Sequence, residues 1–169
     1  MKIDLHTYIT NLPTEYVVIR KPAIFPDYVI GSDIDILCRN LDKVIEYSKS
    51  ALKEHEVQYK RRPSGHYHIN IMHGKSLHLK LDFIDSLRVY KSMSIPSDVM
   101  NDIYSSKVRC NGINEPSQEH DLLLRYFEYH EFVQARPSKI KHRHYIESTP
   151  NGMADVIMLL DQYRIPHNE

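Results

Sequence analysis

Apolar and polar positions alternate in two segments near the middle of the chain. In 77–83, leucine and phenylalanine occupy every second position, and Asp82 is one of the polar residues between them. In 66–72, two histidines and an asparagine alternate with tyrosine and isoleucine. Successive side chains of a β-strand point to opposite faces of a sheet. Both segments are therefore predicted to be strands with one apolar face for a core and one polar face for a cleft.

The remaining pattern divides the chain into a first half rich in strands and a second half rich in helices. Because helices do not alternate with the strands, we expect an α+β (α/β) fold with a mixed sheet and flanking helices. The expected catalytic core is 1–93, and 94–169 is expected to form a small C-terminal helical region that packs on or caps the cleft. Further strands are predicted at 16–20, 29–38 and 57–61, an extended connection at 107–113, and helices at 3–11, 41–55, 97–104, 117–129, 138–147 and 153–163. Ser117 is expected to cap one of these helices, and Thr149 or Asn151 the last.

Composition narrows the classes of function. The 169 residues carry no formal net charge, which disfavours a dedicated binder of duplex DNA. We expect no membrane span, because no apolar run approaches the required length of roughly 18 residues, and no signal peptide at the N-terminus. A cytoplasmic protein is the expectation. Cys38 and Cys110 do not make a disulfide framework, and Cys38 is expected to be a buried thiol.

Two carboxylates interrupt the apolar segment 29–38. Asp33 and Asp35 are one residue apart, so on a strand both point to the same side, while Ile34 and Ile36 point to the other. This spacing lets two carboxylates share a hard cation without disturbing the core. A lone Asp-x-Asp is weak evidence, because it occurs by chance and its members also form turns or ion pairs, here with Arg20 or Lys80.

Three features favour a metal site. Gly31 and Ser32 precede the carboxylates and allow close backbone approach. The surrounding residues are apolar, including Val29 and Ile30, and carboxylates in such a run need a cation or another partner. Asp82 lies on the polar face of a second predicted strand and provides a third carboxylate.

The motif Gly-Ser-Asp-Ile-Asp-Ile-Leu at 31–37, followed by Leu-Lys-Leu-Asp-Phe at 79–83, resembles the nucleotidyltransferase superfamily of DNA polymerase β and kanamycin nucleotidyltransferase. The similarity covers roughly residues 14–90. It implies that Asp33, Asp35 and Asp82 are catalytic and bind two Mg²⁺ ions, or Mn²⁺ in their place. A narrower similarity is to the branch found near bacterial surface-glycan genes, where a strand like Val-Val-Leu-Arg precedes the Asp-x-Asp strand.

The sequence departs from the superfamily in one respect. A Gly-Ser or Gly-Gly pair usually lies about ten residues before the paired aspartates and binds the triphosphate, but 18–24 contains none. The candidates for nucleotide and phosphate binding are therefore basic or hydroxyl side chains elsewhere: Arg20, Lys21, Ser32, Lys139, His142 and Arg143. The last three are expected to share one face of a basic helix. The alternative interpretation of this segment is an ordinary solvated surface helix.

The histidines of 66–72 share a face, and His-x-His can bind Zn²⁺. We expect both histidines, together with Asn70, to line the polar side of the sheet near the metals instead. His66, His68 and Lys80 are the acceptor-side candidates.

The sequence predicts an enzyme that transfers a nucleoside monophosphate from a nucleoside triphosphate to a small acceptor, such as a sugar, a sugar phosphate or another glycan precursor, with release of pyrophosphate. One alternative is a nucleotidyltransferase of the toxin or antitoxin type that modifies a protein or RNA. Another is a degenerate nucleotide-binding protein without catalysis. The neutral charge argues against a nucleic-acid partner, and the sequence leaves the oligomeric state open.

Overall fold

The computed structural model describes residues 2–62 and 65–167. The chain forms two compact units, each with its own internal contacts. The first comprises Met1–Ser86 and Lys107–Glu115, and the second comprises Leu87–Ser106 and Pro116–Glu169. The chain thus leaves the first unit after Ser86, and the segment Lys107–Glu115 belongs to the first unit again.

A five-stranded mixed sheet forms the first unit, with the strand order β1-β2-β5-β4-β3. β2 and β5 are parallel, and every other neighbouring pair is antiparallel. The mixed α+β fold predicted from the sequence is thereby confirmed. The strands are β1 (Tyr16–Arg20), β2 (Ser32–Cys38), β3 (Glu56–Arg62), β4 (His66–His73) and β5 (Ser76–Ile84).

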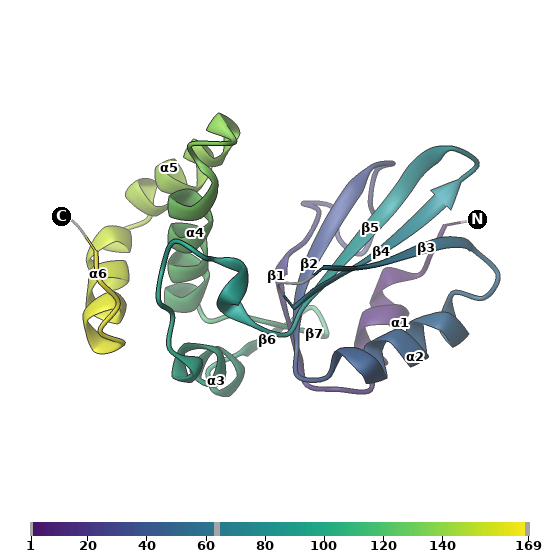
Figure 1. Cartoon of the computed structure of the whole chain (residues 1–169), viewed down its shortest axis with the longest axis horizontal. Helices are drawn as coiled ribbons and strands as arrows, with labels where there is room; N and C mark the ends of the chain where they lie inside the picture. Colours follow the sequence, from purple (N-terminus) through teal and green to yellow (C-terminus); the bar gives the residue numbers. More distant parts are fainter. Residues whose placement is uncertain (1, 63–64, 168–169) are drawn as a thin grey trace. The chain divides into compact units, whose positions relative to one another are not determined.

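Helices α1 (Leu5–Thr10) and α2 (Leu41–Ala51) cover one face of this sheet (Figure 1). Ile34 and Ile36 of β2 are fully buried in the core that forms there, together with Leu81 and Phe83 of β5. The alternation in the sequence thus assigns the faces correctly. The Cys38 thiol is also buried in this core, as expected, and burial raises its pKa to about 12.

β2 begins later than the sequence predicts. Val29 and Ile30 are 65% and 73% exposed and belong to a turn, so they do not flank the carboxylates within the strand. The turn closes through two backbone hydrogen bonds, from Ser32 N to Val29 O and from Gly31 N to His78 O of β5. Gly31 has a φ of +84°, a left-handed conformation that glycine adopts readily. This turn sets where β2 starts beside β5.

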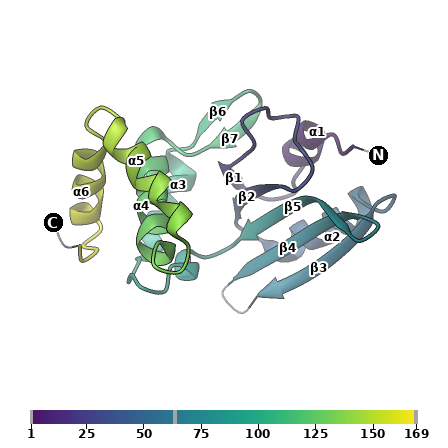
Figure 2. The same cartoon turned by 90° about the horizontal axis from the view of Figure 1, so that it is seen from above.

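The expected extended connection at 107–113 is a hairpin. β6 (Val108–Cys110) and β7 (Ile113–Glu115) pair in antiparallel register around Asn111 and Gly112. Both turn residues have positive φ, 49° and 82°, which is the requirement of a type I′ turn. Figure 2 shows the hairpin beside β1, with which β7 is in contact.

The second unit is helical. Its helices are α3 (Ser97–Ser105), α4 (Gln118–Phe132), α5 (Ile140–Ser148) and α6 (Gly152–Gln162), with short 3-10 turns at Leu87–Val89 and Pro137–Lys139. The Ser117 hydroxyl accepts a hydrogen bond from His120 N and caps α4 as predicted. At the start of α6, Asn151 occupies the cap position but is left-handed, with a φ of 59°, and its side chain makes no capping bond. Thr149 instead ends α5, and its hydroxyl donates back to Tyr145 O. No helix in the described part of the chain combines the length and apolar composition that crossing a bilayer requires.

Candidate active site

A row of polar side chains crosses the sheet on the face opposite α1 and α2. The strand register pairs Arg20 with Asp35, Asp35 with Asp82, Asp82 with His68, and His68 with Lys60. Directly paired residues lie on the same face of a sheet, with Cβ atoms about 4.5–5.5 Å apart in antiparallel pairs. All five strands therefore contribute one side chain to this row, and the two carboxylates lie at its centre.

Arg20 reaches this face because β1 is irregular. The register advances from Val18 opposite Ile36 to Arg20 opposite Asp35, so Ile19 is an extra residue on β1. One extra residue in a strand is a β-bulge, which re-aims the side chains that follow it. In a regular strand Arg20 would share the face of Val18, whose side chain lies in the core. The bulge places the guanidinium beside the carboxylates.

Asp35 and Asp82 are both buried, with 8% and 5% of their surface exposed. Like charges directly opposite each other on a sheet are destabilising, and buried carboxylates need partners. Arg20 Nε lies 3.2 Å from Asp35 Oδ2. Lys80 Nζ donates to Asp82 Oδ2. Each carboxylate of the pair therefore has a basic side chain beside it.

Asp33 extends the acidic surface toward the start of β2. It lies two residues before Asp35, so it shares the same face, and it is exposed. Its register partner on β5 is Lys80, the same lysine that pairs with Asp82. The three aspartates thus run from an exposed edge to a buried centre along two adjacent parallel strands.

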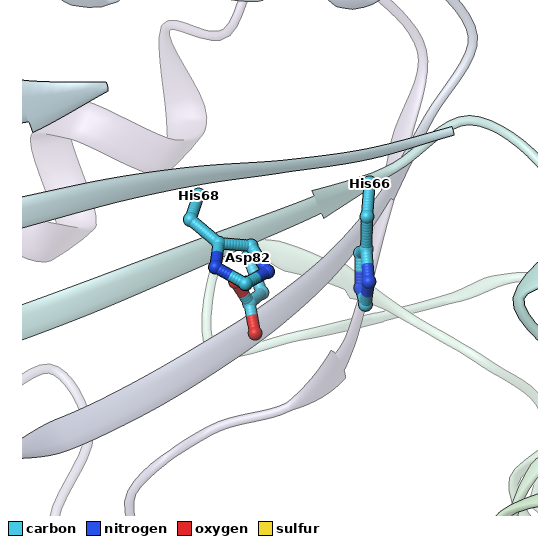
Figure 3. A group of neighbouring side chains, drawn as sticks. All are labelled: His66, His68 and Asp82. Atoms are coloured by element: carbon cyan, nitrogen blue, oxygen red, sulfur yellow. The ribbon is translucent and has the colours of Figure 1, made fainter. Parts of the chain in front are cut away.

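Asp82 also faces two imidazoles (Figure 3). His68 Nε2 lies 3.3 Å from Asp82 Oδ1. His66 lies two residues along β4, with its ring centroid 5.3 Å from that of His68. One ligand atom each from His66, His68 and Asp82 all lie within 4.8 Å of one another. Burial lowers the pKa of His68, with Asp82 acting in the opposite direction, so burial favours the neutral imidazole.

Two further candidates lie in the first unit. Ser32 is the half-buried first residue of β2, next to Asp33. The Lys21 ammonium forms an ion pair with Glu115 of β7 and lies over the Phe25 ring, 5.4 Å from its centroid.

The three basic candidates of 138–147 belong to the second unit. The helix there begins at Ile140, and Lys139 lies in the preceding 3-10 turn, where its Nζ is 2.7 Å from Glu128 Oε2. His142 is 1% exposed and forms part of this unit's interior. Arg143 is half exposed and pairs with Glu147 at 2.7 Å.

Lys60 and Asn70 also lie on the polar face. Asn70 was expected there beside His66 and His68, whereas sequence reasoning did not select Lys60 as functional. Lys60 is the register partner of His68, and Asn70 is the partner of Lys80. Asn70 Oδ1 is buried and has no hydrogen-bond partner among the described residues. The signal that could have found Lys60 was alternation, since Val57 and Tyr59 are two residues apart and Lys60 falls on the other face of the same strand.

No family model matches the sequence, and no curated protein matches it. Among solved structures, the chain is similar to JHP933 from Helicobacter pylori, with 16% identity, a TM-score of 0.44, and coverage of 70% of this chain and 51% of that chain. It is also similar to the Megavirus polyadenylate synthase, with 11% identity, a TM-score of 0.39, and coverage of 96% of this chain and 36% of that one. The chain thus spans about half of the first protein's length and about a third of the second's. Similarity of this degree identifies neither a family nor a substrate, so the function is inferred from the side chains of the sheet.

Proposed function

We propose that the chain is a nucleotidyltransferase that uses two Mg²⁺ ions to transfer a nucleoside monophosphate to a small acceptor with release of pyrophosphate. One observation carries this proposal: Asp35 and Asp82 are direct partners on adjacent parallel strands, and Asp33 shares their face. Three carboxylates in this arrangement offer the oxygen ligands that Mg²⁺ prefers.

The donor set fits such ions. Asp82 is buried on the same face, and its Oδ2 atom, which Lys80 contacts, would be the oxygen that binds these ions. Asp35 lies beside it with little exposure, and Asp33 is open to solvent. A pair of Mg²⁺ ions would supply Lewis-acid activation of the acceptor hydroxyl and charge stabilisation for the leaving pyrophosphate.

The basic residues of the row have two roles in this proposal. Without bound cations, Arg20 and Lys80 neutralise Asp35 and Asp82. When divalent ions bind the carboxylates, both side chains become available to contact phosphate oxygens, for which a guanidinium is well suited. Ser32 and Lys21 lie near the start of β2 and the end of β1 and are proposed to contact the nucleotide. His66 and His68 would face the acceptor, proposed to be a sugar, a sugar phosphate or a related glycan precursor.

The same ion pairs support a second candidate function. Because Arg20 and Lys80 each pair with one oxygen of a carboxylate without a metal, the site is also compatible with a protein that binds a nucleotide and does not turn it over. Transfer to a protein or RNA remains the alternative within the enzyme class.

The test is a pyrophosphate-release assay on the purified chain. Each nucleoside triphosphate is supplied with Mg²⁺ or Mn²⁺ and with a panel of sugars and sugar phosphates. We expect release with one class of acceptor and none after chelation. Asp35→Asn and Asp82→Asn should each lower the rate by more than about 100-fold, beyond the 10–100-fold typical of losing an outer-shell partner.

Asp42→Asn is the matched control. Asp42 lies in the first turn of α2, and this helix packs on the face of the sheet opposite the site. It should leave the rate unchanged. Nucleotide binding that depends on Mg²⁺ but yields no pyrophosphate with any acceptor would favour the non-catalytic candidate. Unaltered turnover and nucleotide binding in both Asp35→Asn and Asp82→Asn would exclude the two-metal site.

A further inference from the structure

Two imidazoles and a carboxylate converge on the polar face of β4 and β5. His68 and Asp82 are direct partners in the antiparallel register, and His66 follows on the same face of β4 (Figure 3). The ligand atoms of the three residues lie within 4.8 Å of one another. The register, not the sequence spacing, brings this carboxylate to the histidines.

The spacing of these atoms suits a metal ion. Two ligands at 2.0–2.1 Å from a tetrahedral ion lie about 3.4 Å apart. The distance between His68 Nε2 and Asp82 Oδ1 is 3.3 Å, so an ion can bind both atoms without moving either strand. The third ligand, from His66, has to close from at most 4.8 Å, which is within reach of a side-chain rotation.

Asp82 Oδ1 provides the second, independent indication of a ligand. Asp82 is 5% exposed, and within 2–62 and 65–167 its Oδ1 atom has no hydrogen-bond partner. Its other oxygen is bound by Lys80. A buried carboxylate oxygen without a hydrogen bond is costly, and a cation at the centre of the three side chains would satisfy it.

The chemistry of the donors distinguishes this site from the Mg²⁺ site proposed above. Imidazole suits Zn²⁺, Fe²⁺ and other first-row transition metals, whereas Mg²⁺ selects carboxylate, carbonyl and water oxygens. Two histidines and one carboxylate also leave coordination positions open for water or a substrate.

We propose that His66, His68 and Asp82 bind one first-row transition-metal ion, in a site distinct from that of Asp33 and Asp35. Asp82 is the point at which the two sites meet, with Oδ1 toward the histidines and Oδ2 toward Lys80. The proposal does not depend on nucleotidyl transfer, because it needs only the three ligands.

Co²⁺ is a suitable probe, because its visible absorption reports the ligands and geometry around the ion. We expect the chelator-treated full chain to bind one equivalent of Co²⁺ in the presence of excess Mg²⁺, and Zn²⁺ to displace it. His66→Gln and His68→Gln should each weaken Co²⁺ binding by about 100-fold or more, beyond the 10–100-fold typical of losing an outer-shell partner. His73→Gln is the matched control, since His73 is exposed at the end of the same strand.

Asp35→Asn separates this proposal from the previous one. It should abolish Mg²⁺-dependent turnover and leave Co²⁺ binding intact. The transition-metal site is overturned if the wild type binds no stoichiometric Co²⁺ or Zn²⁺, or if binding persists in both His66→Gln and His68→Gln. Circular dichroism of each variant checks the fold, and the two histidine variants provide independent measurements.

Discussion

Arg20 Nε lies 3.2 Å from Asp35 Oδ2 because a single extra residue in β1 turns the arginine toward the polar face of the sheet. The two side chains are 27% and 11% exposed, so the ion pair is largely, but not completely, shielded from solvent. With Asp82 directly beside Asp35, this guanidinium offsets the repulsion between the two carboxylates when no divalent ion is bound.

Arg20→Gln is therefore expected to destabilise the chain. The loss should be about 1–3 kcal/mol in the free energy of unfolding, the range for leaving a buried polar group without its partner. Arg39→Gln is the control, because Arg39 and Glu15 form an ion pair with side chains 41% and 40% exposed. Exposed pairs contribute less than about 1 kcal/mol. Denaturant titration at low salt measures both, and equal losses would show that Arg20 has no special role.

Divalent cations should stabilise the wild type by binding its folded carboxylates. At Mg²⁺ one hundred times above its Kd the gain is about 2.7 kcal/mol, enough to raise the Tm by several degrees. Asp35→Asn should remove this rise, and Asp42→Asn should retain it. Thermal unfolding with Mg²⁺ and after chelation provides the comparison. A Tm that responds to Mg²⁺ equally in wild type and Asp35→Asn would place the ion elsewhere.

The second unit should lose stability in mild acid through His120. This imidazole is buried between Ser117 and Tyr163, with Nδ1 2.9 Å from the Ser117 hydroxyl and Nε2 3.1 Å from the Tyr163 hydroxyl. Tyr163 donates to Asp102, which leaves its oxygen to accept from Nε2–H. Burial lowers the pKa of His120 below its usual 6.5. The unfolded chain therefore takes up a proton first as the pH falls, and stability present above pH 6.5 is lost below it.

His120→Gln should reduce the fall in the free energy of unfolding between about pH 7 and about pH 5. Part of the fall will remain, because burial also lowers the pKa of His68 and His130. His144→Gln, at an exposed position of α5, should behave as the wild type does. An unchanged pH dependence in His120→Gln would show that His120 does not cause the loss of stability in mild acid.

The hairpin turn at Asn111–Gly112 should be sensitive to substitution. A Cβ at Gly112 would lie 2.6 Å from His6 Nε2, whereas a Cβ at Gly74 meets nothing within 4 Å. Both glycines have positive φ, so Gly74→Ala measures the backbone effect alone, about 1 kcal/mol. Gly112→Ala should cost more, and His6→Ala in the same chain should recover the difference. Equal losses for the two alanine variants would indicate that His6 moves aside freely.

Much of the sheet was predictable because burial follows the alternation of residues. The polar face with His66, His68 and Asp82, and the apolar face with Ile69 and Leu81, follow from a period of two. The late start of β2 was not predictable from hydrophobicity, because Val29 and Ile30 have strand propensity but are held in the turn before Gly31.

The hairpin at 108–115 was missed although Asn-Gly is a strong turn signal. Its strands are three residues each, too short for alternation to be recognised, and β6 is exposed throughout. The residues of the candidate site were easier to find than their neighbours. Asp33, Asp35 and Asp82 share a face by sequence alone, but which side chains lie opposite them depends on register, which a single sequence does not determine.

The register beside Asp82 is also set by an irregularity. Ile71 pairs with Leu79 and Met72 with Leu77, so His78 is an extra residue on β5. If the pairing near the turn continued without it, His68 would lie opposite Leu81 instead of Asp82. Regular pairing of β1 would likewise set Ile19 opposite Asp35. The same amino acids paired in two regular ladders would no longer form the site. Its composition therefore depends on two local irregularities of the backbone as much as on the side chains themselves.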